Sequence, residues 1–283
     1  MAGNGAVIAV CGHEAAYGRA LDGLLGPDVS VVANGRALFR AVAAHRRRGE
    51  PSTVVPMTLG REPGLVADTA RTLRAVPAAG PGAVLLAEPF GTAQHLVAWL
   101  RAAAGRAPAD AALLVTAPSG DPFEDAELHR VAALVRRYGR HTLVEVAFDG
   151  GDPDPAEGVR RCGLLGAERV ALLPASFAEI GPVGAQPVPV ADIGPLVQVP
   201  ALRRVLDERV ADAHRRLREH GDDGITAGLA AADHHGHAHT HSPGEGHGHA
   251  HGHPHAHGPG DAHRHHHHHP SAAAADRGIR SSA

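Results

Sequence analysis

The sequence contains no lysine, and all 27 of its basic residues are arginine. This excludes a phosphate-binding loop of the Gly-x-x-x-x-Gly-Lys-Ser/Thr type and any catalysis through a lysine Schiff base. Residues 1–220 hold 24 arginines against 24 aspartates and glutamates, so this part of the chain is neutral. It lacks the basic stripe that a nucleic-acid surface requires, and we therefore expect no nucleic-acid partner.

Cysteine and long apolar runs are also scarce. The two cysteines, Cys11 and Cys162, lie in segments that are predicted to form different elements, so no disulfide framework is indicated and a reducing cytoplasm is favoured. No apolar run approaches the roughly 18 residues of a membrane span, and residues 1–5 carry none of the basic residues of a secretory signal. We expect a cytoplasmic protein with no membrane partner.

The segment Ala6–His13 reads Ala-Val-Ile-Ala-Val-Cys-Gly-His. Such an apolar run predicts a buried central strand, and its polar end lies where open α/β sheets place their chemistry. In an extended chain Cys11 and His13 lie on the same side, and Gly12 allows a ligand to approach the backbone. His13 is therefore the first candidate functional residue. The alternative is a histidine that only bonds a neighbouring loop.

The alternation of strands and helices occurs twice along the chain. Val-Val-Pro-Met-Thr-Leu at 54–59 aligns with Leu-Leu-Pro-Ala-Ser-Phe at 172–177, and residues 86–91 align with 189–194. The two prolines are compatible with strands only at a bulge or a strand end. We predict an α/β protein with two duplicated halves, residues 1–107 and 108–220, whose parallel sheets face a central cleft. Strands are expected at 6–11, 29–33, 53–58, 83–88, 112–117, 142–148, 169–176 and 188–191, and helices at 15–25, 36–48, 64–76, 93–104, 123–138, 156–165 and 199–220.

Residues 221–283 lose this periodicity, and 17 of the 24 histidines fall between residues 234 and 269. Interspersed Gly, Ala and Pro cannot bury enough surface to fold alone, so we expect a disordered tail. Closely spaced imidazoles bind nickel, cobalt, zinc and copper with modest selectivity, which predicts storage or delivery of a divalent metal. An affinity tag is the alternative, but this tract is interrupted and is followed by residues 270–283. The predicted ligands in the tail are His237, His239, His241, His247, His249 and His251.

Five short motifs carry a family resemblance over roughly residues 6 to 215. They are Val-Cys-Gly-His at 10–13, Val-Val-Pro-Met-Thr-Leu-Gly at 54–60, Glu-Pro-Phe-Gly at 88–91, Ala-Pro-Ser-Gly-Asp-Pro at 117–122 and Leu-Leu-Pro at 172–174. With these five motifs in this order, the chain resembles the class II tetrapyrrole chelatases, most of all the sirohydrochlorin cobaltochelatase and ferrochelatase family of cobalamin and siroheme synthesis. The resemblance implies insertion of a divalent metal into sirohydrochlorin, with cobalt favoured over iron or nickel. No cofactor beyond this substrate ion is expected, and a homodimer is an option.

The resemblance also implies site residues. In the family, the histidine after the first strand binds the incoming metal and helps to take the pyrrole protons, and His13 matches it. A second histidine usually follows the proline strand, but Leu-Gly-Arg-Glu-Pro-Gly-Leu at 59–65 contains none. Glu62, Glu88 or His95 can substitute, and Glu88 is preferred because strand ends point into a cleft. The predicted catalytic residues are thus His13 and Glu88, and the predicted metal ligands outside the tail are His13, Glu88 and His95; Cys11 is a further candidate, with a buried role as the alternative.

The carboxylates of sirohydrochlorin suit arginine forks, which makes Arg19 and Arg61 candidates for the rim of the site, with a solvated surface role as the alternative. The competing function is a non-catalytic cobalt or nickel storage protein or metallochaperone. The missing second histidine favours that reading, and His13 opposes it. A periplasmic binding protein also has two α/β halves, but no export signal supports one.

Overall fold

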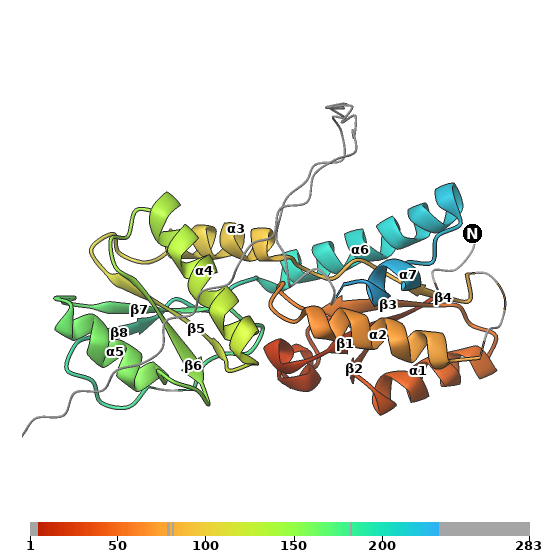
Figure 1. The fold of residues 1–283 in the computed structure, drawn as a ribbon, viewed down its shortest axis with the longest axis horizontal. Helices are drawn as coiled ribbons and strands as arrows, with labels where there is room; N and C mark the ends of the chain where they lie inside the picture. Colours follow the sequence, from red (N-terminus) through yellow and green to blue (C-terminus); the bar gives the residue numbers. More distant parts are fainter. Residues whose placement is uncertain (1–4, 78–79, 81, 182, 232–283) are drawn as a thin grey trace, which may run out of the picture. The chain divides into compact units, whose positions relative to one another are not determined.

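The computed structural model describes residues 5–77, 80, 82–181 and 183–231. Within them the chain forms two parallel four-stranded sheets with helices packed on them (Figure 1). The strand order is β2-β1-β3-β4 in the first sheet and β6-β5-β7-β8 in the second, which is the same topology twice. The predicted α/β fold with two β/α halves is confirmed.

The elements follow one another in the order that the repeat predicts. The expected bounds of β1, β2, α3 and α6 agree with the structure, and the remaining strands and regular helices differ only at their ends. The first half of the sequence contains β1 (Ala6–Cys11), η1 (His13–Leu21), β2 (Val29–Ala33), α1 (Arg36–Arg47), β3 (Ser52–Met57), α2 (Pro63–Ala75), β4 (Val84–Leu86) and α3 (Ala93–Ala104). The rest contains β5 (Ala112–Pro118), α4 (Pro122–Tyr138), β6 (Val144–Asp149), α5 (Pro155–Leu164), β7 (Val170–Pro174), β8 (Val190–Asp192), α6 (Val199–His220) and α7 (Ile225–Leu229).

The two strand prolines lie where the neighbouring strand has already ended. The pairing of β3 with β4 stops at Val54 and Leu86, two residues before Pro56. The carbonyl of Pro56 then accepts the N–H of Phe90 at 2.9 Å. Any other residue at position 56 would direct its own N–H toward this same side of the strand. Pro174 likewise lies beyond the last pair of β7 and β8. Neither proline therefore removes a ladder hydrogen bond.

The helix predicted over 15–25 is wrong. The structure instead has η1, a 3₁₀ segment interrupted by left-handed residues, with φ of 47° at Ala16, 55° at Tyr17 and 103° at Gly18. A left-handed conformation costs a non-glycine residue about 1–2 kcal/mol, so neighbouring contacts must hold it. One of them is the N–H of Tyr17, which donates to the carbonyl of Gly12 at 2.8 Å. The tight turn keeps the side chains after β1 at the end of the sheet.

The last helix of each sequence repeat packs on the other repeat's sheet (Figure 1). Helix α3 contacts α4 and β7, whereas α6 contacts β3 and β4. The ring of His214 on α6 bonds the hydroxyl of Thr53 at 3.1 Å, and Arg216 donates to the carbonyl of Leu86 at 2.7 Å. The boundary at residue 107 therefore separates the sequence repeats, while the folded halves exchange a helix.

Residues 221–231, which the sequence assigned to the tail, contain the short helix α7. The carbonyl of Asp223 accepts the N–H of Leu86 at 2.8 Å and so continues the edge of β4. Helix α7 packs against α2, and Gly228 lies against Leu86 and Ala70. The predicted tail ligands, from His237 onward, lie outside the described residues. No helix in the described ranges is long and apolar enough to cross a bilayer.

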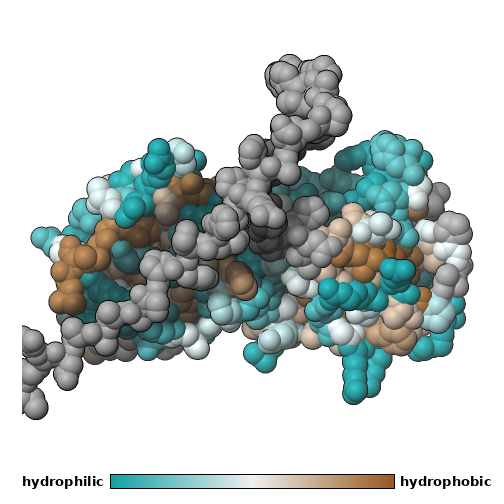
Figure 2. All heavy atoms as spheres, in the orientation of Figure 1, coloured by the Kyte–Doolittle hydropathy of each residue, from teal (hydrophilic) through white to brown (hydrophobic). Residues whose placement is uncertain are grey.

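The face displayed in Figure 2 mixes apolar and charged residues. Exposed large apolar side chains include Leu164 and Leu165 at the end of α5. Apart from such positions, apolar side chains gather in three buried clusters, of which the largest contains residues of both sheets. The two halves are therefore joined through a shared core.

Both cysteines are free and buried, which predicts unreactive thiols. Burial, with a smaller effect of the Glu62 charge, raises the pKa of Cys11 to about 12, and burial with the Glu145 charge raises the pKa of Cys162 to about 11. Because the thiolate is the reactive form, iodoacetamide should alkylate neither residue at pH 8 in the folded protein. It should alkylate both residues once the protein is unfolded in guanidinium chloride. Mass spectrometry checks this; equal labelling rates in the two conditions would contradict it.

Candidate functional site

His13 lies directly after β1, with 17% of its side chain exposed. Its backbone N–H donates to Oε1 of Glu62 at 2.5 Å, and its ring Nδ1 contacts the same oxygen. Its ring Nε2 faces Oε2 of Glu124 at 3.8 Å. The imidazole is thus held between a carboxylate from the loop after β3 and one from α4 of the second half.

Two glycines make this approach sterically feasible. A Cβ on Gly12 would lie 2.4 Å from Oε1 of Glu62. A Cβ on Gly120 would lie 2.2 Å from Oε2 of Glu124 and 3.2 Å from Nε2 of His13. At both positions a Cβ would displace the end of a glutamate side chain, so glycine allows the two carboxylates to lie this close to the ring.

Glu62 and Glu14 are buried carboxylates fixed by the chain around Thr58. The hydroxyl of Thr58 donates to Glu14, whose Oε2 also accepts the N–H of Leu59 at 2.8 Å. The N–H of Glu62 donates back to the Thr58 hydroxyl oxygen at 3.3 Å. Three atoms in this cluster are buried without a hydrogen-bond partner among the described residues: Nε2 of His13, Oε2 of Glu62 and Oε1 of Glu14.

The charges around the ring favour a cation there. Burial lowers the pKa of His13, but the hydrogen bond and charge of Glu62, together with the charges of Glu124 and Glu14, outweigh it, so the pKa is raised overall. Burial and the Glu62 charge raise the pKa of Glu14 to about 7, although Arg61 opposes them. Burial also raises the pKa of Glu124. Acidic groups that stabilise an imidazolium also stabilise a metal ion on the same nitrogen.

Arg61 is neither a rim residue nor a surface residue, so both expectations for it were wrong. Its side chain is fully buried and donates to the carbonyls of Glu124 at 3.3 Å and Pro118 at 3.4 Å. It also donates to Oδ1 of Asp125 at 3.2 Å. The backbone and Asp125 of the other half thus bind Nε and Nη2 of the buried guanidinium, whereas Nη1 has no hydrogen-bond partner among the described residues. Arg61 thereby ties the start of α4 to the half that carries His13.

The structure gives the other predicted site residues different partners. Glu88 is exposed and pairs with Arg216 at 2.8 Å. His95 forms part of the N-terminal cap of α3, where its Nδ1 accepts the N–H of Thr92 at 3.2 Å. Neither contacts His13 in the interactions found among the described residues, and their roles as metal ligands stay predictions. Cys11 packs in the core, as its buried alternative required.

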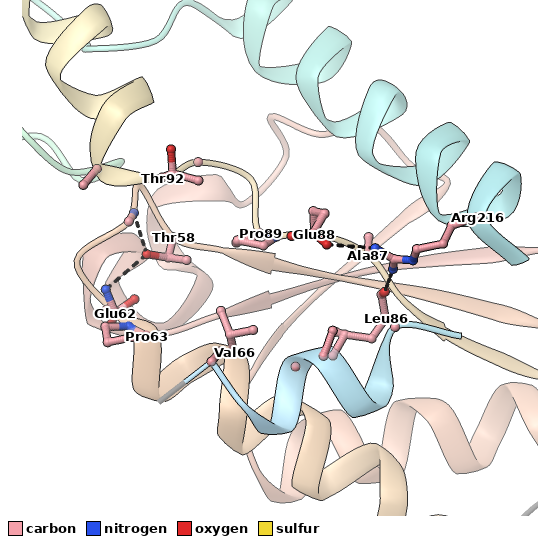
Figure 3. A pocket seen from close by; sticks show the side chains of 17 residues that line it. Thr58, Glu62, Pro63, Val66, Leu86, Ala87, Glu88, Pro89, Thr92 and Arg216 are labelled. Carbon is pink, nitrogen blue, oxygen red and sulfur yellow. Dashed lines mark hydrogen bonds and ion pairs between the residues drawn. The ribbon is translucent and has the colours of Figure 1, made fainter. Parts of the chain in front are cut away.

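Two pockets lie beside this cluster. The first, about 330 Å³, is formed by α2, α7 and the loop after β4, with Thr58 and Glu62 at one end and the Glu88–Arg216 pair at the other (Figure 3). Its remaining wall is largely apolar. The second, about 490 Å³, has walls from both halves: η1 on one side, and on the other the residues after β7 and the start of α6. Arg19 is exposed and is among the residues that line this second pocket, and its role at the rim of a site stays a prediction.

Glu62 was one of three candidates in the sequence, and Glu124 was missed. The only sequence signal for Glu124 is its place three residues after Asp121, which makes it part of a helix capping box. Within the described ranges no group of three or more His, Cys, Asp or Glu side chains is arranged to hold a metal ion. A comparison with models of protein families finds no match for the sequence, and neither does a comparison with curated proteins.

Proposed function

We propose that this protein inserts a divalent metal ion into sirohydrochlorin, with cobalt favoured and iron or nickel as the alternatives. The observation that carries the proposal is His13, whose Nδ1 is held by Glu62 while its Nε2 has no hydrogen bond among the described residues. A carboxylate on one imidazole nitrogen orients the ring and strengthens the other nitrogen as a ligand. Such a nitrogen can hold the ion and later accept a proton.

The reaction breaks two pyrrole N–H bonds and forms bonds from the ring nitrogens to the metal, so two protons must be accepted. In our proposal Nε2 of His13 first holds the ion and, once the ion has moved into the macrocycle, takes one proton. Glu62 stabilises the resulting imidazolium through Nδ1. The partnerless Oε2 of Glu62 is our candidate for the second proton. The protons then pass to solvent.

In our proposal the pocket between η1 and the loop after β7 holds the tetrapyrrole. The residues that line it include the apolar Leu21 and Phe177 and the charged Arg19. An apolar macrocycle with peripheral carboxylates matches this combination. His13 begins the same η1 segment that forms one wall of the pocket.

An absorbance assay tests the proposal directly. The full-length protein is mixed with sirohydrochlorin and, separately, Co²⁺, Ni²⁺ or Fe²⁺, and the tetrapyrrole spectrum is followed. We expect the spectral change of metal insertion to be faster than in a control without protein for at least one ion. If the protein accelerates insertion of none of the three, the chelatase function is wrong.

The second candidate function is non-catalytic metal storage or delivery by a metallochaperone. It is favoured by the 17 histidines between residues 234 and 269, because closely spaced imidazoles bind divalent ions without a catalytic site. This candidate predicts that the protein binds Co²⁺ or Ni²⁺ but leaves the rate of insertion into sirohydrochlorin unchanged. The same assay therefore separates the two functions.

Removal of the histidine-rich tail is expected to affect insertion only when metal is scarce. Because α7 packs on α2, the chain should be cut after Ala231 rather than after residue 220. We expect an unchanged rate at saturating metal and a reduced rate at limiting metal, measured as initial rates over a series of metal concentrations. A variant cut after residue 220 serves as a control for the loss of α7. Loss of the rate at saturating metal in the longer variant would contradict a delivery role.

A further inference from the structure

We propose that Glu124 is the second protein ligand of the substrate metal, so that the ion is held between the two halves by Nε2 of His13 and a carboxylate oxygen of Glu124. This inference rests on the proposed function and extends it. The loop after β3 lacks the second histidine of the family that this chain resembles. Glu124 would supply a ligand in place of that histidine, and it belongs to the second sequence repeat.

The distance between the two side chains suits a shared ion. Nε2 of His13 and Oε2 of Glu124 are 3.8 Å apart, which is too far for a hydrogen bond. Ligands that each lie about 2.0–2.2 Å from one metal ion can be up to about 4 Å apart. Because Glu62 binds Nδ1, the ring is held with Nε2 directed at Glu124. Nε2 is also a buried atom with no hydrogen-bond partner among the described residues.

The carboxylate of Glu124 is held in place independently of His13. Its Oε2 accepts the N–H of Asp121 at 3.1 Å, and its own backbone carbonyl accepts a hydrogen bond from the buried Arg61 at 3.3 Å. Gly120 leaves the space between Glu124 and His13 free of a side chain. A ligand fixed by its helix cap and by a contact from the other half needs little rearrangement to bind an ion.

Glu62 is less suited to be the second ligand. Its Oε1 already accepts the backbone N–H of His13 and contacts Nδ1 of the same residue. It therefore acts as the group that positions the ring, while Glu124 lies on the side of the available nitrogen. Two protein ligands leave the other coordination positions to water or to the incoming macrocycle. Such a weak hold is appropriate for an ion that must be released.

Metal-induced thermal stabilisation of the full-length protein tests the inference. The histidine-rich tail is expected to bind ions in the folded and the unfolded chain alike, whereas the site of His13 and Glu124 exists only in the folded chain and so raises the melting temperature. We expect Co²⁺ to raise the melting temperature of the wild type. Glu124→Gln should lose this rise, and the control Glu127→Gln, which alters a residue paired with Arg130 on the same helix, should keep it.

Each variant is compared with itself without metal, so a change in basal stability does not affect the result. A wild-type rise that Glu124→Gln retains and His13→Ala loses would overturn the role of Glu124 and leave His13 as a ligand. No rise in the wild type would overturn the metal site as a whole. In the insertion assay, Glu124→Gln should raise the KM for the metal about tenfold or more with an unchanged KM for sirohydrochlorin. An unchanged KM for the metal would contradict the inference.

Discussion

Replacement of His13 by alanine is expected to lower the rate of metal insertion into sirohydrochlorin by about 100-fold or more, since a positioned acid–base group contributes about 10²–10⁴-fold. Under the proposed function, the variant loses both the nitrogen that would hold the ion and the group that would take the first proton. Initial rates from the tetrapyrrole absorbance measure the effect. Circular dichroism checks that the variant is folded.

Two further variants isolate the cause. His13→Gln keeps a polar group that can bond Glu62. Its amide has no basic nitrogen to hold the ion or to take a proton, so this variant should be as inactive as His13→Ala. His45→Ala removes a partly buried histidine on α1 that pairs with the exposed Glu50, and this variant should have the wild-type rate. Wild-type turnover by His13→Ala would remove His13 from the catalytic assignment.

Replacement of Arg61 by methionine is expected to lower the free energy of unfolding by about 3–5 kcal/mol, the usual cost of breaking a buried ion pair. Methionine keeps much of the volume but donates no hydrogen bond. Asp125 and the carbonyls of Pro118 and Glu124 would lose a donor where the two halves meet. Urea unfolding followed by circular dichroism measures the change.

The matched control is Arg71→Met. Arg71 pairs with Asp68 on the exposed surface of α2, and exposed pairs contribute about 0–1 kcal/mol. The difference between the two variants therefore reports burial and not merely the loss of an arginine. Equal effects would contradict the role of Arg61 as the connection between the halves.

Features that depend on neighbouring residues could be predicted from the amino-acid sequence. The apolar runs predicted the strands, and the repeat at 54–59 and 172–177 predicted two sheets of the same topology. The expected bounds of α3 agree with the structure, in which the side chain of Thr92 caps the helix. The position of His13 at the end of β1 followed from the same local pattern.

Which side chains meet depends on how distant segments of the chain pack, and the sequence did not predict it. Glu62 is 49 residues from His13 in the sequence, and Glu124 lies in the other repeat, so no local pattern pairs them. The exchange of α3 and α6 and the burial of Arg61 depend equally on contacts between segments far apart. The η1 segment also departs from its local helical pattern. Hydrogen bonds from Ala15 and Tyr17 to the carbonyl of Gly12 hold it in another conformation and outweigh its helix propensity. Periodicity and capping are properties of adjacent residues, whereas a site formed across two sheets exists only once those sheets have packed together.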